Sequence, residues 1–192
     1  KKDESGKNIF QGGFLGLDNI SLFDRSRPLP SGRHLDQSDA TAWMGFYCLN
    51  MISIALELAR TNPVYQDTAS KFFEHFMEIA WAMTGDVRHG VSLWDEGDGF
   101  FYDAIHIDDK EVIPLKVRSM VGLIPLLAVE VLDGELLDEM SDFSRRMLWF
   151  FDNRIYLRDQ GHMACIKKPG IGERRIFSIL NADRLRRVLE YM

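Results

Sequence analysis

Two long stretches of the chain carry apolar residues at the spacing of a helix. From Asp39 to about Arg60 these residues recur with the 3.6-residue period, and the opposite side is apolar as well. A helix that is apolar nearly all round is buried inside a larger body. From about Pro63 to Thr84 a single apolar stripe faces a polar side, which predicts a surface helix. The short turn between them predicts a helical hairpin with an inner and an outer member.

The helical period breaks between residues 85 and 118. Apolar residues alternate with their neighbours from Phe100 to Ala104, and a second apolar run follows the turn Asp108-Asp109-Lys110, so we expect a short β-hairpin. Helical patterns return over about residues 121–132, 136–151 and 182–192, the first of them interrupted by Pro125. Residues 1–38 and 153–178 are punctuated by glycine and proline and predict loops, with at most one strand pair in the second.

Together these elements predict an all-α fold with a small β-hairpin. Inner helices that alternate with outer helices build an α/α toroid, and a helical bundle is the competing arrangement. The chain has 192 residues, whereas a full toroid needs twelve helices and roughly 300 residues once short connections are added. We therefore expect residues 1–192 to form one partial domain, an incomplete toroid built of helical hairpins.

Composition and charge narrow the range of partners. The chain is 46% hydrophobic and 27% charged, which is typical of a globular domain, and its net charge of −6 argues against nucleic acid or an anionic membrane as the main partner. Ser53 and Glu57 interrupt the longest apolar run, so no membrane span is expected.

Cys48 and Cys165 do not make a disulfide framework, so we expect a reducing, cytoplasmic compartment. His162 and Cys165 lack a second pair of ligands, so we predict neither a metal nor a cofactor.

Carboxylates placed among aromatic or apolar residues are the remaining candidates for chemistry. In the glycine-rich segment 16–25, Asp18 and Asp24 stand between bulky apolar residues, where desolvation raises the pKa of a carboxyl group toward the range that a general acid needs. The alternative is that Asp18 or Asp24 caps a turn through its own backbone.

A second concentration of acids covers residues 93–103. Four carboxylates and four aromatic residues occur within these eleven positions. Sugar rings present a C–H surface to aromatic faces and hydroxyl groups to carboxylates, so this segment is typical of a sugar-binding site, with Trp94, Asp95, Tyr102 and Asp103 as candidates. The alternative is a β-hairpin with acids in its turn and aromatics in the core.

Three further residues are candidates for the wall of a ligand cavity. Asp39 and Trp43 lie at the start of the inner helix, whose N-terminus would meet a ligand if it faced a cavity. Simple N-capping of the helix also explains Asp39. Arg118 follows the predicted hairpin and is suited to pair with a cavity carboxylate or to form a structural salt bridge.

Three motifs in this order resemble a known family of enzymes. They are Gly-Leu-Asp-Asn-Ile-Ser at residues 16–21, Ser-Asp followed by Trp at residues 38–43, and Leu-Trp-Asp-Glu-Gly-Asp-Gly-Phe-Phe-Tyr-Asp at residues 93–103. The chain resembles glycoside hydrolase family 63, the group of mannosyl-oligosaccharide glucosidase and its bacterial relatives, from about Gly12 to Met120. Trehalases share the order of motifs more distantly. The resemblance implies an (α/α)6 catalytic barrel of which this chain is a fragment.

The resemblance also implies roles for single residues. Asp18 corresponds to the general acid of the family, and Asp24 is the second choice because Ile20 interrupts the usual Asn-Ser pair. The family inverts the anomeric configuration, which requires a second carboxylate roughly 6.5–9.5 Å from the first as general base. That base is implied to lie beyond Met192, so the fragment alone is expected to be inactive. The residues implied or proposed to contact substrate are Asp24, Asp39, Trp43, Trp94, Asp95, Tyr102, Asp103 and Arg118.

The expected partners follow from this interpretation. The substrate would be an oligosaccharide or a glycoside, and the remainder of the parent chain would complete the domain. Because an incomplete toroid exposes apolar helix faces, self-association through those faces is also expected. The alternative function is a non-catalytic helical scaffold or a carbohydrate-binding module.

Overall fold

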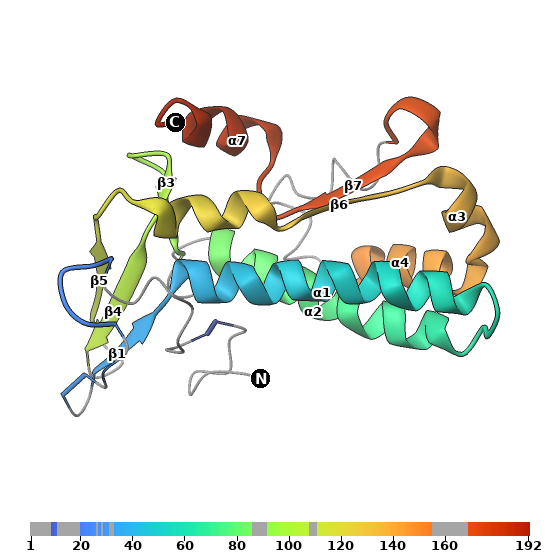
Figure 1. Ribbon diagram of the computed structural model, residues 1–192, viewed down its shortest axis with the longest axis horizontal. Helices are drawn as coiled ribbons and strands as arrows, with labels where there is room; N and C mark the ends of the chain where they lie inside the picture. The colour runs from blue at the N-terminus through green and yellow to red at the C-terminus, as the bar shows by residue number, and fades with distance from the viewer. Residues whose placement is uncertain are drawn as a thin grey trace.

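The computed structural model describes residues 9–10, 20–25, 27, 29–30, 33–85, 92–107, 111–154 and 169–192 (Figure 1). The helices are α1 (Ser38–Ala59), α2 (Tyr65–Thr84), the 3-10 helix η2 (Met120–Leu127), α3 (Gly134–Glu139), α4 (Ser141–Asn153), the short 3-10 helix η3 (Ile171–Glu173) and α7 (Ala182–Leu189). The strands are β1 (Arg33–Asp36), β2 (Trp94–Asp95), β3 (Phe100–Phe101), β4 (Asp103–Ile107), β5 (Glu111–Leu115), β6 (Val129–Leu132) and β7 (Arg175–Ser178).

Helices α1 and α2 lie side by side as the predicted hairpin (Figure 1). α1 is the inner member, because it packs between α2 on one side and η2 with β6 on the other. α2 packs between α1 and α4. The polar side of α2 is exposed at Lys71, Glu74 and His75, as a surface helix requires. Gln66 departs from this side: it is buried, and its side-chain oxygen accepts a 3.0 Å hydrogen bond from the backbone N–H of Phe143 in α4.

An aromatic cluster fixes the end of the hairpin against the rest of the chain. The Phe73 ring on α2 lies edge-on to the rings of Phe143, Phe150 and Phe151 on α4 and of Phe177 on β7, at centroid distances of 5.4–6.1 Å. Edge-to-face pairs of this kind add to the stabilisation that burial of the rings provides. The cluster therefore joins the helical hairpin to the sheet formed by β6 and β7.

Seven strands form three small sheets within the described ranges. β4 and β5 form the predicted hairpin, and β1 adds to its free side to give the order β1-β4-β5. β2 pairs with β3, and β6 pairs with β7 across a long interval of sequence. The first sheet lies at the end of the molecule where α1 begins (Figure 1).

The predicted all-α class, and with it the incomplete (α/α)6 toroid, is wrong. Of the described residues, 54% are helical and 18% lie in strands, so the fold is mixed. β1 and β6 were not predicted, and β7 lies in the segment 153–178, where one strand pair was allowed, but its partner is β6; each of the three is only four residues long. A four-residue strand is too short to show a period, and its partner lies far away in the sequence, so tertiary pairing decides its conformation.

Two predicted helices are also corrected. The stretch over residues 121–132 is a 3-10 helix that ends at Leu127, because Pro125 cannot donate a helical hydrogen bond, and it is followed by β6, which pairs with β7. The stretch over residues 136–151 is divided into α3 and α4 at Met140, whose backbone is not helical (φ −97°, ψ 60°). The last helix begins at Ala182 as predicted and ends at Leu189.

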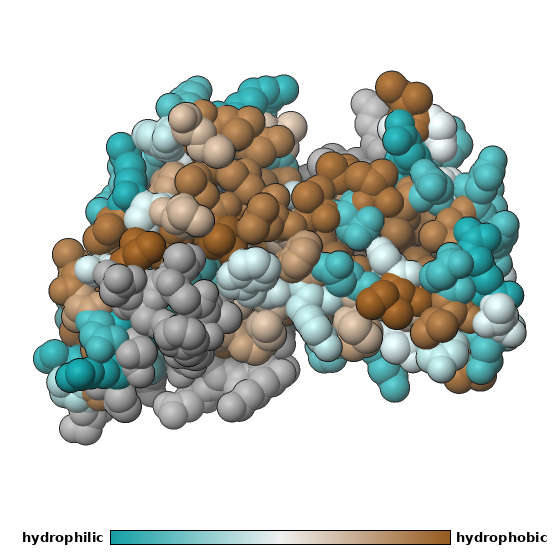
Figure 2. Space-filling model, in the orientation of Figure 1, coloured by the Kyte–Doolittle hydropathy of each residue, from teal (hydrophilic) through white to brown (hydrophobic). Residues whose placement is uncertain are grey.

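Apolar side chains also reach the surface. Figure 2 shows apolar surface over η2 and β6, where Met120, Leu127, Val129 and Val131 are exposed. α1 exposes Tyr47, Ile54 and Leu58. By length and composition alone α1 would suffice to cross a membrane, a property that it shares with core helices of globular domains, and 44% of its most apolar window is buried inside the protein. Self-association through such faces stays a prediction.

Candidate functional site

An arginine and two aspartates form a buried charge cluster where α1 begins beside β4. Terminal nitrogens of the Arg25 guanidinium bond both carboxylate oxygens of Asp39, and its Nε lies 2.9 Å from Oδ2 of Asp103. Asp103 Oδ1 accepts a 2.9 Å hydrogen bond from the backbone N–H of Ser38. The side chains of Arg25 and Asp39 are 1% exposed, and that of Asp103 is 4% exposed. This buried cluster ties the segment before β1 to the starts of α1 and β4.

Asp39 lies inside the first turn of α1. The helix begins at Ser38, and the residue before it, Gln37, makes no side-chain cap, so the N-cap interpretation of Asp39 is wrong. Asp39 Oδ1 accepts a 2.8 Å hydrogen bond from the backbone N–H of Ala40. Since the first backbone N–H groups of a helix lack helical partners and carry partial positive charge, a carboxylate in this turn is stabilised.

Burial dominates the ionisation of Asp103. Desolvation raises the pKa of its carboxyl group to about 6, although the charge of Arg25 and the hydrogen bond from Ser38 act in the opposite direction. The nearby carboxylate of Asp39 raises it further. Two carboxylates share one guanidinium here, so a proton on Asp103 balances the charge of the buried cluster.

A second, more open cluster surrounds the turn between β2 and β3. The Lys116 ammonium lies 2.7 Å from Oδ2 of Asp95 and 3.1 Å from Oδ2 of Asp98. The Tyr102 hydroxyl donates to Asp98 Oδ2 at 3.1 Å and accepts from Nε of Arg118 at 3.2 Å. The side chains of the two acids are 20–29% exposed, and those of Lys116 and Arg118 are about half exposed. We call these five residues the edge cluster.

The turn itself holds the acids of the edge cluster in place. Asp95 Oδ1 accepts a 2.7 Å hydrogen bond from the backbone N–H of Asp98, and Gly99 takes a positive φ of 65° that suits glycine. Partial burial raises the pKa of Asp95, but hydrogen bonds from Lys116 and from the turn backbone, together with the Lys116 charge, outweigh it and the pKa is lowered. Asp95 is therefore a stable anion and a hydrogen-bond acceptor.

Helix α7 covers the aromatic part of this region. The guanidinium groups of Arg184 and Arg187 lie over the Trp94 ring, 5.3 and 5.5 Å from its centroid, and both bond the Glu96 carboxylate. Trp94 is only 3% exposed. The Trp94 face that the sequence offers to a sugar is therefore occupied by α7, and its role in this chain is to seat that helix.

The other predicted site residues are dispersed. Asp18 lies outside the described residues. Asp24 is exposed, and its Oδ2 lies 2.9 Å from Nε of Arg27. Trp43 is half-buried and packs edge-on against Phe46 at 5.6 Å. The structure thus joins Asp39 with Asp103 in one cluster and Asp95 with Tyr102 and Arg118 in the other, whereas Asp24 and Trp43 belong to separate local contacts.

Sequence reasoning missed three members of the two clusters. Arg25 is the last residue of the glycine-rich segment 16–25, but nothing local to it shows that its guanidinium reaches Asp39 and Asp103. Lys116 and Asp98 join the edge cluster through the β4–β5 hairpin and the β2–β3 turn. The one available signal was the excess of acids over cations at residues 93–103, which requires cations from elsewhere in the fold.

A yeast protein is similar to this chain over nearly the whole length of the chain. No family model matches the chain, and no solved structure matches it. The chain is similar to Uncharacterized protein YMR196W of Saccharomyces cerevisiae, with 47% identity over 200 residues. This match covers 98% of the chain but 18% of the yeast protein, so the chain spans less than a fifth of the length of the curated relative that it matches.

Proposed function

We propose that this chain is part of the catalytic region of a glycoside hydrolase acting on glucosides, and that the edge cluster binds sugar hydroxyl groups. The observation that supports the proposal is the set of acceptors and donors held side by side at the β2–β3 turn: the carboxylates of Asp95 and Asp98 beside the cations of Lys116 and Arg118. Neighbouring hydroxyls of a sugar donate to carboxylates and accept from ammonium or guanidinium groups.

The two clusters would divide the work in this function. The edge cluster is open enough to reach a ligand, since Lys116 and Arg118 are about half exposed. The buried cluster holds the start of α1 against the start of β4, one residue after Tyr102. We therefore assign substrate contact to the edge cluster and positioning to the buried cluster, including Asp39 and Asp103.

The hydrolysis itself requires two carboxyl groups. The resemblance implies Asp18 as the general acid, which would protonate the leaving oxygen while a general base activates a water on the opposite face of the sugar. Asp95 is a poor choice for the acid because its pKa is lowered. The base belongs, on the resemblance, to a part of the parent protein that follows this chain.

The test uses the full-length parent protein and a chromogenic α-glucoside. We expect Asp18→Asn to lower kcat by about 100-fold or more, because a general acid contributes about 10²–10⁴-fold. Asp98→Asn is expected to raise KM by about tenfold with a smaller effect on kcat, since it removes a charged acceptor for a hydroxyl. Asp142→Asn, an exposed acid on α4 paired with Arg145, is the matched control. Unchanged kinetics in Asp18→Asn and Asp98→Asn would remove the proposal.

A second candidate is a carbohydrate-binding or scaffold segment without catalysis. The observation that favours it is that the described acids of both clusters are already paired with cations: Asp39 and Asp103 with Arg25, Asp95 with Lys116. In this case the parent protein would bind an oligosaccharide, binding would weaken in Asp98→Asn, and no glucoside would be hydrolysed.

A further inference from the structure

Three metal-binding side chains share one face of the sheet formed by β1, β4 and β5. His34 and Asp36 lie two positions apart in β1, and alternate residues of a strand point to the same face. His106 in β4 lies directly opposite His34 in the antiparallel register. Directly opposite residues place their side chains next to each other on the same face. The strand pairing thus gathers two imidazoles and one carboxylate that are far apart in the sequence.

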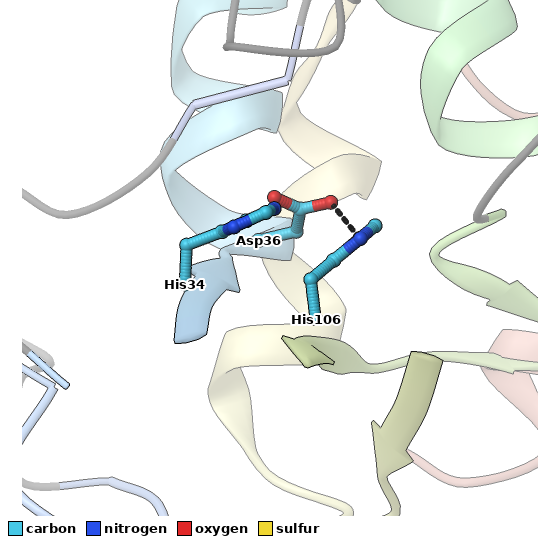
Figure 3. A group of neighbouring side chains, drawn as sticks. All are labelled: His34, Asp36 and His106. Atoms are coloured by element: carbon cyan, nitrogen blue, oxygen red, sulfur yellow. Dashed lines mark ion pairs between the residues drawn. The ribbon is translucent and has the colours of Figure 1, made fainter. Parts of the chain in front are cut away.

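The three groups are close enough to meet at one point. A nitrogen of each histidine and an oxygen of Asp36 all lie within 4.8 Å of one another. The His106 Nε2 is 2.8 Å from Asp36 Oδ2, and the His34 and His106 rings are stacked with centroids 4.4 Å apart. Figure 3 shows both rings directed toward the Asp36 carboxylate.

Burial makes this arrangement rigid on one side and open on the other. Asp36 is fully buried and His106 is 7% exposed, whereas His34 is only half-buried. The ligand atoms of a tetrahedral zinc site lie about 3.4 Å apart, because each is about 2.1 Å from the ion. The three ligand atoms lie within 4.8 Å of one another, so an ion would draw them closer together, and the half-buried His34 is the least enclosed of the three side chains.

We propose that His34, Asp36 and His106 bind one divalent transition-metal ion of the zinc type. Two imidazole nitrogens with one carboxylate oxygen are a usual ligand set for such ions, with a remaining position for water or another ligand. The competing explanation is a purely structural ion pair between Asp36 and His106. It uses two of the three groups, whereas an ion accounts for the placement of His34 as well.

The test is metal binding to the full chain after removal of metal with a chelator. Calorimetric titration with Zn²⁺ is expected to give one tight site per chain, and Co²⁺ is expected to give visible absorption bands of a low-coordinate site with nitrogen and oxygen ligands. His34→Ala should weaken binding more than about tenfold, because loss of even an outer-sphere partner of a metal ligand has an effect of that size. His75→Ala, which removes an exposed histidine from α2, is the matched control.

A measurement of folding separates ligand loss from misfolding. Zn²⁺ should raise the melting temperature of the unsubstituted chain and of His75→Ala, because an ion that binds only the native state stabilises it. The melting temperature of His34→Ala should not respond, although its circular dichroism without metal matches that of the unsubstituted chain. Should His34→Ala misfold, Asp36→Asn and His106→Gln provide the same comparison. Two results would overturn the proposal. One is a folded variant of His34, Asp36 or His106 that binds Zn²⁺ as tightly as the unsubstituted chain does. The other is an unsubstituted chain that does not bind one Zn²⁺ per molecule.

Discussion

The buried cluster and the edge cluster both pair carboxylates with cations, yet the pKa values of Asp103 in the first and Asp95 in the second are shifted in opposite directions. Asp103 is paired with Arg25 at 2.9 Å, and its pKa is raised to about 6. Asp95 is paired with Lys116 at 2.7 Å, and its pKa is lowered. Desolvation raises both, but it exceeds the favourable interactions only at the buried position. The presence of a cationic partner therefore does not decide the ionisation of a carboxyl group in this protein; the extent of burial does.

The same difference separates the energetic roles of the two clusters. A buried charge that loses its partner remains desolvated, so the loss of one member is strongly destabilising. An exposed pair that loses one member regains water, so little stability is lost. We infer that the buried cluster maintains the fold around α1 and β4, whereas the edge cluster is free to exchange its partners for a ligand.

The sharpest test of this comparison is removal of the cation from the buried cluster. Arg25→Met is expected to lower the free energy of unfolding by about 3–5 kcal/mol, because Asp39 and Asp103 then remain buried without their shared counter-ion. The change is measured by urea denaturation at neutral pH. Arg27→Met is the control, since the Arg27 side chain is 82% exposed and pairs with Asp24 at the surface. An equal loss in the two variants would contradict the distinction between the clusters.

The pH dependence of stability tests the raised pKa of Asp103. Its pKa is about 6 in the folded chain against 3.8 for an ordinary aspartate carboxyl group, so between these values the native state binds more protons than the unfolded state. Stability contributed by this group is therefore present in full below about pH 4 and is lost as the pH rises through 6, by an amount on the order of a few kcal/mol.

Asp103→Asn removes this titration while keeping the shape of the side chain. Its free energy of unfolding should lack the decline between pH 4 and 6 that the unsubstituted chain shows, and Asp142→Asn, with an exposed acid on α4, should retain it. The measurement is a series of urea denaturations across this interval. The same decline in Asp103→Asn would show that another group titrates there.

Much of the helical part of this fold was predictable, and the reason lies in length. The apolar periods of α1 and α2 extend over 22 and 20 residues, long enough to define a helix and its face. β1 and β7 have four residues each and take their conformation from β4 and β6. The residues of these strands do not indicate which distant strand they pair with, so the mixed fold class could not be predicted from the local sequence.

The candidate site shows the same division. Asp95 of the edge cluster was predictable because four acids are concentrated at residues 93–103. The joining of Asp39 to Asp103 was not, because it depends on Arg25, which comes from a segment without regular structure. Likewise His34 and His106 meet only because β1 adds to the free side of β4. The general acid, Asp18, stays a prediction from the resemblance.

The smallest expected effect is the most specific to the edge cluster. Asp95→Asn removes one charge but keeps an oxygen that accepts the backbone N–H of Asp98, so the β2–β3 turn is preserved. We expect a loss of less than about 1 kcal/mol at low salt, because the Asp95–Lys116 pair is partly exposed. This loss should become smaller in about 1 M NaCl, because the Debye screening length of the solution is then only about 3 Å and the attraction between exposed charges is weakened. The loss in Arg25→Met should persist, because salt does not enter the buried cluster.

Asp95→Ala is the companion variant: it removes the turn acceptor as well, so its larger loss should be insensitive to salt. If Asp95→Asn were as damaging as Arg25→Met and equally insensitive to salt, the edge cluster would be a structural core feature and its assignment to ligand binding would have to be abandoned.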